Sequence, residues 1–220
     1  MIILTENEYK ELLTVTETIE KDQSGEKVLK YSDGKYMKLF RRKRFFSSAL
    51  IYPYWRRFVR NAHGLKRKGI PTIEKIEKIV RVPHLRKTGV LYQPLQGETL
   101  KHLILNQKAK KKLPEEFGAF VATLHRKGIY FSSLHLGNVI LTDSNELGLI
   151  DISDMRIVPF PIPLFTRKTN LDYLFRCRQG MKIFDAEQRQ EFIKGYLDKT
   201  PKALRKIMTQ FFEQQLKKIL

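Results

Sequence analysis

The fold is decided by YFSSLHLGNVIL at 130–141 together with LGLIDISD at 147–154. Two short apolar runs of strand type flank a polar loop, in which Asn138 stands at the end of the loop and Asp151 follows the second run. Amide and carboxylate oxygens are the ligands that hard divalent cations prefer. Because the two runs can pair as a hairpin, we expect Asn138 and Asp151 to lie close together, although either residue alone is typical of a turn or a cap.

The composition indicates a folded chain, either one domain or one domain in two lobes. Its 220 residues are 42% hydrophobic, which is enough for a sizeable core. The single cysteine, Cys177, excludes an internal disulfide and suits a reducing compartment. No signal peptide is recognisable in MIILTENEYK, and the apolar run VPFPIPLF at 158–165 is too short to span a membrane. We therefore expect a cytoplasmic protein.

The strongest global signal is the positive charge. Forty-two Lys and Arg against 23 acidic residues leave a formal charge of +19, and the excess is clustered in RRKR at 41–44, RRFVR at 56–60, KRK at 66–68 and KAKKK at 108–112. A single cluster is usually a solvated face, but the sum attracts polyanions such as nucleic acid, anionic lipid or phosphorylated glycan. We expect the clusters at 41–44 and 56–60 to bind an anionic membrane surface or a phosphorylated glycan.

Sequence patterns predict strands with one helix, followed by mostly helices. VLKY at 28–31 and KYMKLF at 35–40 indicate a hairpin, residues 48–68 a helix, and residues 76–82 and 89–93 two further strands before the break QPLQGETL. A helix begins near Pro114, Asp185 and Gln188 form a capping box, and Thr200-Pro201 precedes the last helix. This order predicts the α+β class.

The chain resembles the lipopolysaccharide kinase family (Kdo/WaaP type, including toluene-tolerance-protein-like members) of the protein-kinase-like superfamily. The matching stretch runs from LHRKGIYFSSLHLGNVIL to LGLIDISDMR, with weaker matches in KYMKLFRRKR, NAHGLKRKGIPT and YQPLQGETL. The resemblance implies a two-lobed, protein-kinase-like α+β fold, with an antiparallel-sheet N-lobe plus one helix over residues 1–95 and a mostly helical C-lobe over residues 96–220. It also implies ATP and magnesium as cofactors.

The resemblance further implies roles for single residues. Lys38 matches the strand lysine that contacts the nucleotide phosphates, Gln93 to Leu95 match the hinge whose backbone binds adenine, and Asn138 and Asp151 match the metal ligands. Strand alternation is compatible with this role of Lys38, because its neighbours at 37 and 39 share the opposite face.

Three positions depart from the family's pattern. Ser133 stands where the family has the aspartate that accepts the substrate proton, and such a base is typically worth about 10²–10⁴-fold in rate. No glutamate lies between Glu26 and Glu74 to pair with the strand lysine, and Ile152-Ser153-Asp154 replaces the usual glycine and aromatic residue. His135 and Asp154 are the candidate substitutes for the base, although a histidine in such a loop is more often structural.

Three functions stay open on the sequence alone. The leading one is an ATP-dependent kinase that phosphorylates a heptose or Kdo sugar of the lipopolysaccharide core at the inner face of the inner membrane. The second is a pseudokinase that regulates or scaffolds envelope assembly. The third is nucleic-acid binding, suggested by aromatic and basic residues that alternate in LFRRKRFFSSALIYPYWRRFVR. It is disfavoured, because nucleic-acid binding needs none of the kinase-like spacing.

Overall fold

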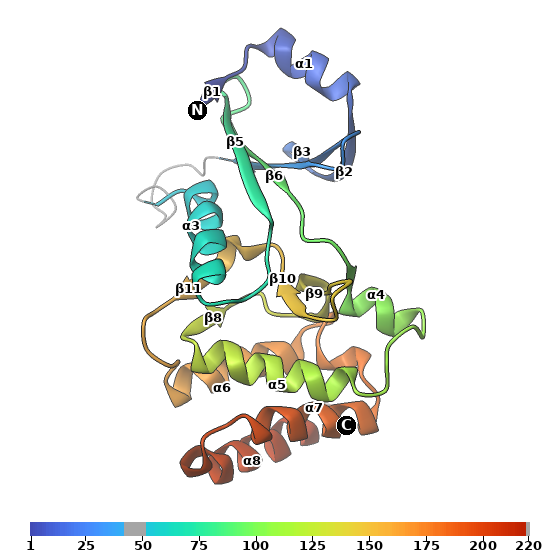
Figure 1. Ribbon diagram of the computed structural model, residues 1–220, viewed down its shortest axis with the longest axis vertical. Coiled ribbons are helices and arrows are strands. Elements are labelled where there is room, and N and C mark those ends of the chain that lie inside the picture. Colours follow the sequence, from blue (N-terminus) through green and yellow to red (C-terminus); the bar gives the residue numbers. More distant parts are fainter. Residues whose placement is uncertain (42–51, 219–220) are drawn as a thin grey trace. The chain divides into compact units, whose positions relative to one another are not determined.

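The computed structural model describes residues 1–41 and 52–218, which belong to two compact units (Figure 1). The first unit comprises Met1–Arg67 and Pro71–Leu95, and the second comprises Lys68–Ile70 and Gln96–Leu220. A sheet dominates the first unit and helices dominate the second. The α+β class predicted from the sequence is therefore confirmed.

Among its described residues the first unit contains a six-stranded sheet in the order β1-β5-β6-β4-β3-β2, in which β1 and β5 pair in parallel and the other neighbours are antiparallel. The predicted hairpin is confirmed as β3 and β4, and the two predicted later strands are confirmed as β5 and β6. The elements of this unit are β1 (Ile2–Ile3), α1 (Glu6–Thr14), β2 (Thr16–Asp22), β3 (Gly25–Tyr31), β4 (Tyr36–Arg41), α3 (Tyr54–Arg67), β5 (Lys75–Val82) and β6 (Lys87–Gln93).

Helix α3 begins later than the sequence predicted. The prediction started at residue 48, but residues 48–51 lie outside the described part of the chain, and the helix is observed from Tyr54. Pro53 precedes it and accepts a hydrogen bond from Arg57 N. A proline fits this position, because the first helical turn leaves backbone N–H groups without an intrahelical acceptor.

The two faces of the sheet have different partners. On β4, Met37 and Leu39 are buried against α1, where Tyr9 joins the same core. On the opposite face the ring of Phe58 from α3 packs 5.5 Å from Phe40 and 5.3 Å from Tyr92, measured between ring centroids. Strand alternation thus directs Lys38 to the face that carries α3.

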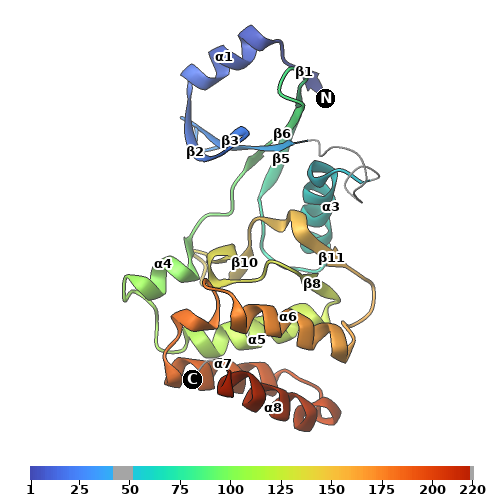
Figure 2. The ribbon, with the colours of Figure 1, turned by 180° about the vertical axis from the view of Figure 1, so that it is seen from behind.

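The second unit is built around helices α5 to α8 (Figures 1 and 2). Helices α5 and α7 approach closely at Gly118 and Gly195, where an added Cβ would lie 2.0 Å from a backbone oxygen of the other helix. The helices are α4 (Leu100–Leu105), α5 (Leu113–Arg126), α6 (Leu164–Arg176), α7 (Ala186–Asp198) and α8 (Lys202–Lys217), with short 3₁₀ turns η1 (Leu136–Asn138), η2 (Ile152–Asp154) and η3 (Met181–Ile183).

Two small sheets complete this unit and carry the polar loop. One has the order β10-β9-β7 and the other pairs β11 with β8. Their strands are β7 (Glu98–Thr99), β8 (Ile129–Phe131), β9 (Val139–Leu141), β10 (Leu147–Leu149) and β11 (Met155–Ile157). The capping box of Asp185 and Gln188 is confirmed at the start of α7. None of the helices in the described ranges is long and apolar enough to cross a membrane.

Candidate functional site

Asn138 and Asp151 stand at the same end of the β9–β10 hairpin. Val139 pairs with Leu149, and Ile150 N donates to Asn138 O at 3.1 Å, so Asp151 follows the residue directly opposite Asn138. The chain thereby brings an amide and a carboxylate to one edge of a small sheet.

The orientation of the Asn138 side chain is fixed from within the loop. Its Nδ2 donates to the backbone oxygen of Ser133 at 2.9 Å, and the residue is 8% exposed. This hydrogen bond turns the amide oxygen away from the Ser133 carbonyl. An oxygen held in this way is a suitable ligand for a hard cation.

Asp151 has an unusual backbone. Its φ of 51° and ψ of 44° place it in the left-handed region, where a residue with a Cβ costs of order 1–3 kcal/mol. The side chain is exposed, whereas the following Ile152 is fully buried. Ile152 therefore anchors the chain in the core directly after the strained residue, and such strain is concentrated at functional positions in proteins.

Ser132 connects the two ends of the polar loop. Its backbone nitrogen and its hydroxyl both donate to the backbone oxygen of Asp154, at 3.2 and 2.6 Å. The side chain of Asp154 is exposed, and Ser133 is partly exposed. The structure thus holds Ser133, Asn138, Asp151 and Asp154 within one hydrogen-bonded loop system.

His135 caps the 3₁₀ turn of the loop. Its Nδ1 accepts a hydrogen bond from Gly137 N at 3.1 Å, so in the neutral ring the proton is on Nε2. Burial lowers the pKa of His135; Asp151 raises it and the charge of Lys101 lowers it further. The ring is therefore neutral near pH 7 and presents a donor, which disfavours His135 as the proton acceptor that the sequence suggested.

The loop is supported from the segment after α6. Leu136 N donates to Gln179 O at 2.9 Å, and a Cβ on Gly137 would lie 2.8 Å from Gln179 Oε1. Two residues before Gln179, the half-buried Cys177 ends α6. Its Sγ points at Leu174 O, 3.7 Å away, and its carbonyl oxygen accepts a hydrogen bond from Gly180 N. Burial raises the pKa of the Cys177 thiol.

A buried network lies beneath the strand that precedes the loop. His125 Nε2 lies 3.1 Å from Asn170 Oδ1, and Asn170 Nδ2 donates to Phe131 O at 2.6 Å. Because that bond fixes the amide, His125 must donate from Nε2 and accept from the Tyr196 hydroxyl at Nδ1, 2.8 Å away. Burial lowers the pKa of His125 to about 4. The ring is thus neutral and joins α5, α6, α7 and β8.

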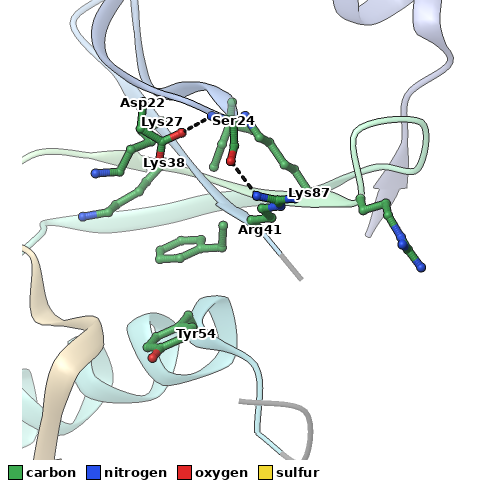
Figure 3. A pocket seen from close by; sticks show the side chains of 10 residues that line it. Asp22, Ser24, Lys27, Lys38, Arg41, Tyr54 and Lys87 are labelled. Atoms are coloured by element: carbon green, nitrogen blue, oxygen red, sulfur yellow. Dashed lines mark hydrogen bonds between the residues drawn. The ribbon is translucent and has the colours of Figure 1, made fainter. Parts of the chain in front are cut away.

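The first unit holds a cationic cavity of about 700 Å³. Five of its ten lining residues are Lys or Arg and one is acidic; the ten are Asp22, Ser24, Lys27, Lys38, Leu39, Phe40, Arg41, Tyr54, Arg86 and Lys87. Figure 3 shows the amino groups of Lys27 and Lys38 extending side by side, with Arg41 close to Ser24. Such a concentration of donors and charge suits a polyphosphate.

The turn between β2 and β3 forms one wall of this cavity. Ser24 N donates to Asp22 Oδ1 at 2.7 Å, and Arg41 donates to Ser24 Oγ at 2.6 Å. Gly25, the first residue of β3, has a φ of +88° that favours glycine. Lys87 is 4% exposed and donates to Glu26 O at 2.7 Å, and burial lowers its pKa.

Sequence reasoning missed most of this cavity. Lys27, Arg86 and Lys87 carry no motif, and they come together only because the sheet places β3, β4 and β6 side by side. Arg41 was assigned to a basic cluster at 41–44, yet its side chain lines the cavity; the other three residues of that cluster lie outside the described part of the chain.

The predicted hinge residues end the first unit. Gln93 O accepts from Glu74 N at 2.9 Å, and Gln93 Nε2 donates to Glu77 Oε1 at 3.2 Å. Leu95 is the last residue of the first unit, directly before the second unit resumes at Gln96. The Gln93 carbonyl is therefore engaged within the sheet unit, and adenine recognition by this hinge stays a prediction.

The alternating aromatic and basic residues at the start of α3 pair with each other. Arg56 lies 5.2 Å from the ring of Trp55, Arg57 lies 5.1 Å from Tyr54, and Arg60 lies 4.7 Å from Tyr52. Residues 42–51 of the predicted stretch lie outside the described part of the chain, and these cation–π contacts account for the pattern over residues 52–60. Stacking on nucleic-acid bases is not needed to explain it.

No protein-family model and no curated protein matches the chain. Similar solved structures are WbdD with the kinase inhibitor LY294002, at 12% identity, and the bifunctional kinase-methyltransferase WbdD, at 13%, each with a TM-score of 0.47. The alignments cover 90% and 86% of this chain but 44% and 42% of the WbdD chains, so this chain spans less than half of their length. At these scores the similarity identifies neither a family nor a substrate, and function is inferred from the site.

Proposed function

We propose that the protein is a kinase-like phosphotransferase that binds ATP with magnesium and phosphorylates a heptose or Kdo sugar of the lipopolysaccharide core, or another phosphorylated glycan. The observation that carries this proposal is the placement of Asn138 and Asp151 at one end of the β9–β10 hairpin, with Asp151 in a strained backbone conformation. Oxygen donors of this kind fit magnesium.

Each unit, taken by itself, contains groups that phosphoryl transfer uses. The cavity of the first unit offers Lys38 and four further cations, which suit the phosphates of a nucleotide. Asn138 and Asp151 in the second unit would hold the metal, which when bound neutralises charge that develops on the transferred phosphoryl group. Since phosphoryl transfer depends mostly on positioning and electrostatics, a chain without a strong base can retain activity.

Removal of the proton from the acceptor hydroxyl is the step that the residues of the site support least. Ser133 is not a base near neutral pH, and the Nδ1 of His135 is occupied by Gly137 N. Asp154 is the remaining carboxylate of the loop whose side chain is exposed. We therefore assign acceptor deprotonation to Asp154 and expect slow turnover.

The first test is calorimetric titration with ATP in the presence and absence of magnesium. Asp151→Ala should abolish the magnesium-dependent part of ATP binding, whereas Asp143→Ala, which removes an exposed carboxylate in the turn of the same hairpin, should preserve it. Lys38→Ala should weaken nucleotide binding. The matched control Lys78→Ala, on the exposed side of β5, should leave nucleotide binding unchanged. Wild-type protein that binds ATP equally well without magnesium would contradict the metal assignment.

The second test is transfer of labelled γ-phosphate to core oligosaccharide. Transfer that Asp154→Asn reduces strongly, with ATP affinity unchanged, would support an active kinase with Asp154 as base. Magnesium-dependent ATP binding without transfer to core oligosaccharide or phosphorylated glycans would instead identify a pseudokinase and overturn the proposed activity.

A further inference from the structure

The segment between β11 and α6 is held firmly at both ends. Val158 N donates to Gly128 O at 2.9 Å, and Ile162 N donates to His125 O at 2.8 Å. Ile162 is 4% exposed, and the buried Arg167 donates from Nε to its carbonyl at 2.7 Å. The backbone of this segment is therefore tied to α5 and α6 (Figure 1).

Two phenylalanines point into solvent, Phe160 within this segment and Phe165 in the first turn of α6. Phe160 is 57% exposed and Phe165 is 81% exposed, which makes Phe165 the most exposed large hydrophobic side chain among the described residues. Prolines at 159, 161 and 163 fix φ along the segment, and a Cβ on Gly128 would lie 2.4 Å from Phe160 O. The tight backbone packing fixes the segment around Phe160, and both rings stay exposed although burying them would be favourable.

Only positive charge surrounds the two rings along the chain. No acidic residue occurs from Met155 to Leu171, whereas Arg156 and Lys168 lie in that stretch. Lys168 follows Phe165 by three residues on α6 and so shares its side of the helix. Lys68 donates to Val158 O at 3.2 Å, and Lys127 donates in turn to Lys68 O. Apolar rings and cations thus occur together at one edge of the second unit.

We propose that the segment 158–165 is a contact site for an anionic lipid bilayer. Phe160 and Phe165 enter the interfacial layer, while Lys68, Lys127, Arg156 and Lys168 meet the head groups. Interfacial binding combines buried apolar area with attraction to anionic lipid, and both components are present here. A fluid bilayer requires no groove or shape complementarity, which suits rings that project from a short rigid segment. This surface differs from the basic clusters at 41–44 and 56–60 and does not depend on the kinase proposal.

The test is sedimentation of the full chain with vesicles of phosphatidylcholine alone or mixed with phosphatidylglycerol. Wild-type protein should bind the mixed vesicles much better than the neutral ones. The double variant Phe160→Ser with Phe165→Ser should lower partitioning by roughly tenfold or more, because each ring contributes apolar area. A matched double variant, Val15→Ser with Leu105→Ser, removes two other exposed apolar side chains, 65% and 60% exposed, and should stay within about twofold of wild type.

A spectroscopic measurement tests insertion directly. Phe165→Trp in a Trp55→Phe background places the single tryptophan at the proposed contact, and its emission should shift to the blue and be quenched by brominated lipid. Equal binding of the Phe160/Phe165 variant and wild type, or an equal loss in the matched control, would overturn the proposal. Tryptophan emission that does not respond to anionic vesicles would also overturn it. The same holds if the two rings prove to act only in self-association of the chain.

Discussion

The buried His125 predicts a specific loss of stability in mild acid. In the native state Nε2 donates to Asn170 and Nδ1 accepts from Tyr196, so a second ring proton would force the Tyr196 hydroxyl to give up its hydrogen bond. The folded-state pKa is about 4, against an ordinary value of 6.5. At pH values between these two pKa values, His125 is protonated in the unfolded chain and neutral in the folded chain. The free energy of unfolding therefore falls as the pH falls.

The size of the effect follows from the two pKa values. Between pH 7.5 and pH 5 protonation of His125 in the unfolded chain should remove about 2 kcal/mol of stability. His125→Gln lacks this titration, so its stability should fall by about 2 kcal/mol less over the same interval. At pH 7.5 the variant itself should be less stable by roughly 1–3 kcal/mol, because partners in the buried network lose their hydrogen bonds.

Urea unfolding followed by far-UV circular dichroism measures this difference, because most described helices belong to the second unit. His63→Gln, which removes an exposed histidine of α3, is the matched control and should keep the wild-type dependence on pH. Identical dependence in wild type and His125→Gln would refute the assignment of a neutral, hydrogen-bonded ring.

Three further substitutions test the packing and the loop. Gly118→Ala should destabilise the second unit by about 1–3 kcal/mol or more in urea unfolding, since its Cβ would lie 2.0 Å from Phe192 O, whereas Ala119→Ser at the next position of the same helix should cost much less. Asn138→Ala should weaken magnesium binding less than Asp151→Ala in calorimetry, because a neutral oxygen holds a hard cation less strongly than a carboxylate; the reverse order would mean that the two roles are misassigned. Ser133→Asp supplies a carboxylate base and should raise phosphate transfer by up to about 10²-fold at saturating magnesium, and loss of transfer with intact ATP affinity would show a positive role for the serine hydroxyl.

Local patterns predicted the elements whose signal lies within a few neighbouring residues. Alternation along β4 predicted that Met37 and Leu39 share one face of the strand, and the structure shows both buried. The capping box at Asp185 was equally local. The same kind of signal was present at the start of α1, where Thr5 and Glu8 form a capping box that the sequence reading did not use.

The remaining features depend on segments that are distant in the chain. The cationic cavity needs Lys27 on β3 and Lys87 on β6 to meet across β4, and only the strand order produces that. The tautomer of His135 follows from a single hydrogen bond within its loop, and the support of that loop comes from Gln179, more than forty residues further along the chain. Spacing in the sequence could therefore identify the residues of the loop, but not the tautomer of His135 or the hydrogen bond to Gln179 that holds the loop.

The position of Cys177 allows opening of the turn at 177–180 to be measured without an added label. As the only thiol in the sequence, half-buried and with a raised pKa, it should react slowly with a maleimide while the turn at 177–180 is closed. The same turn carries the Gln179 carbonyl that holds Leu136 in the polar loop. The rate of Cys177 alkylation therefore measures how often this turn opens. A molecule that binds the polar loop and stabilises it should lower that rate.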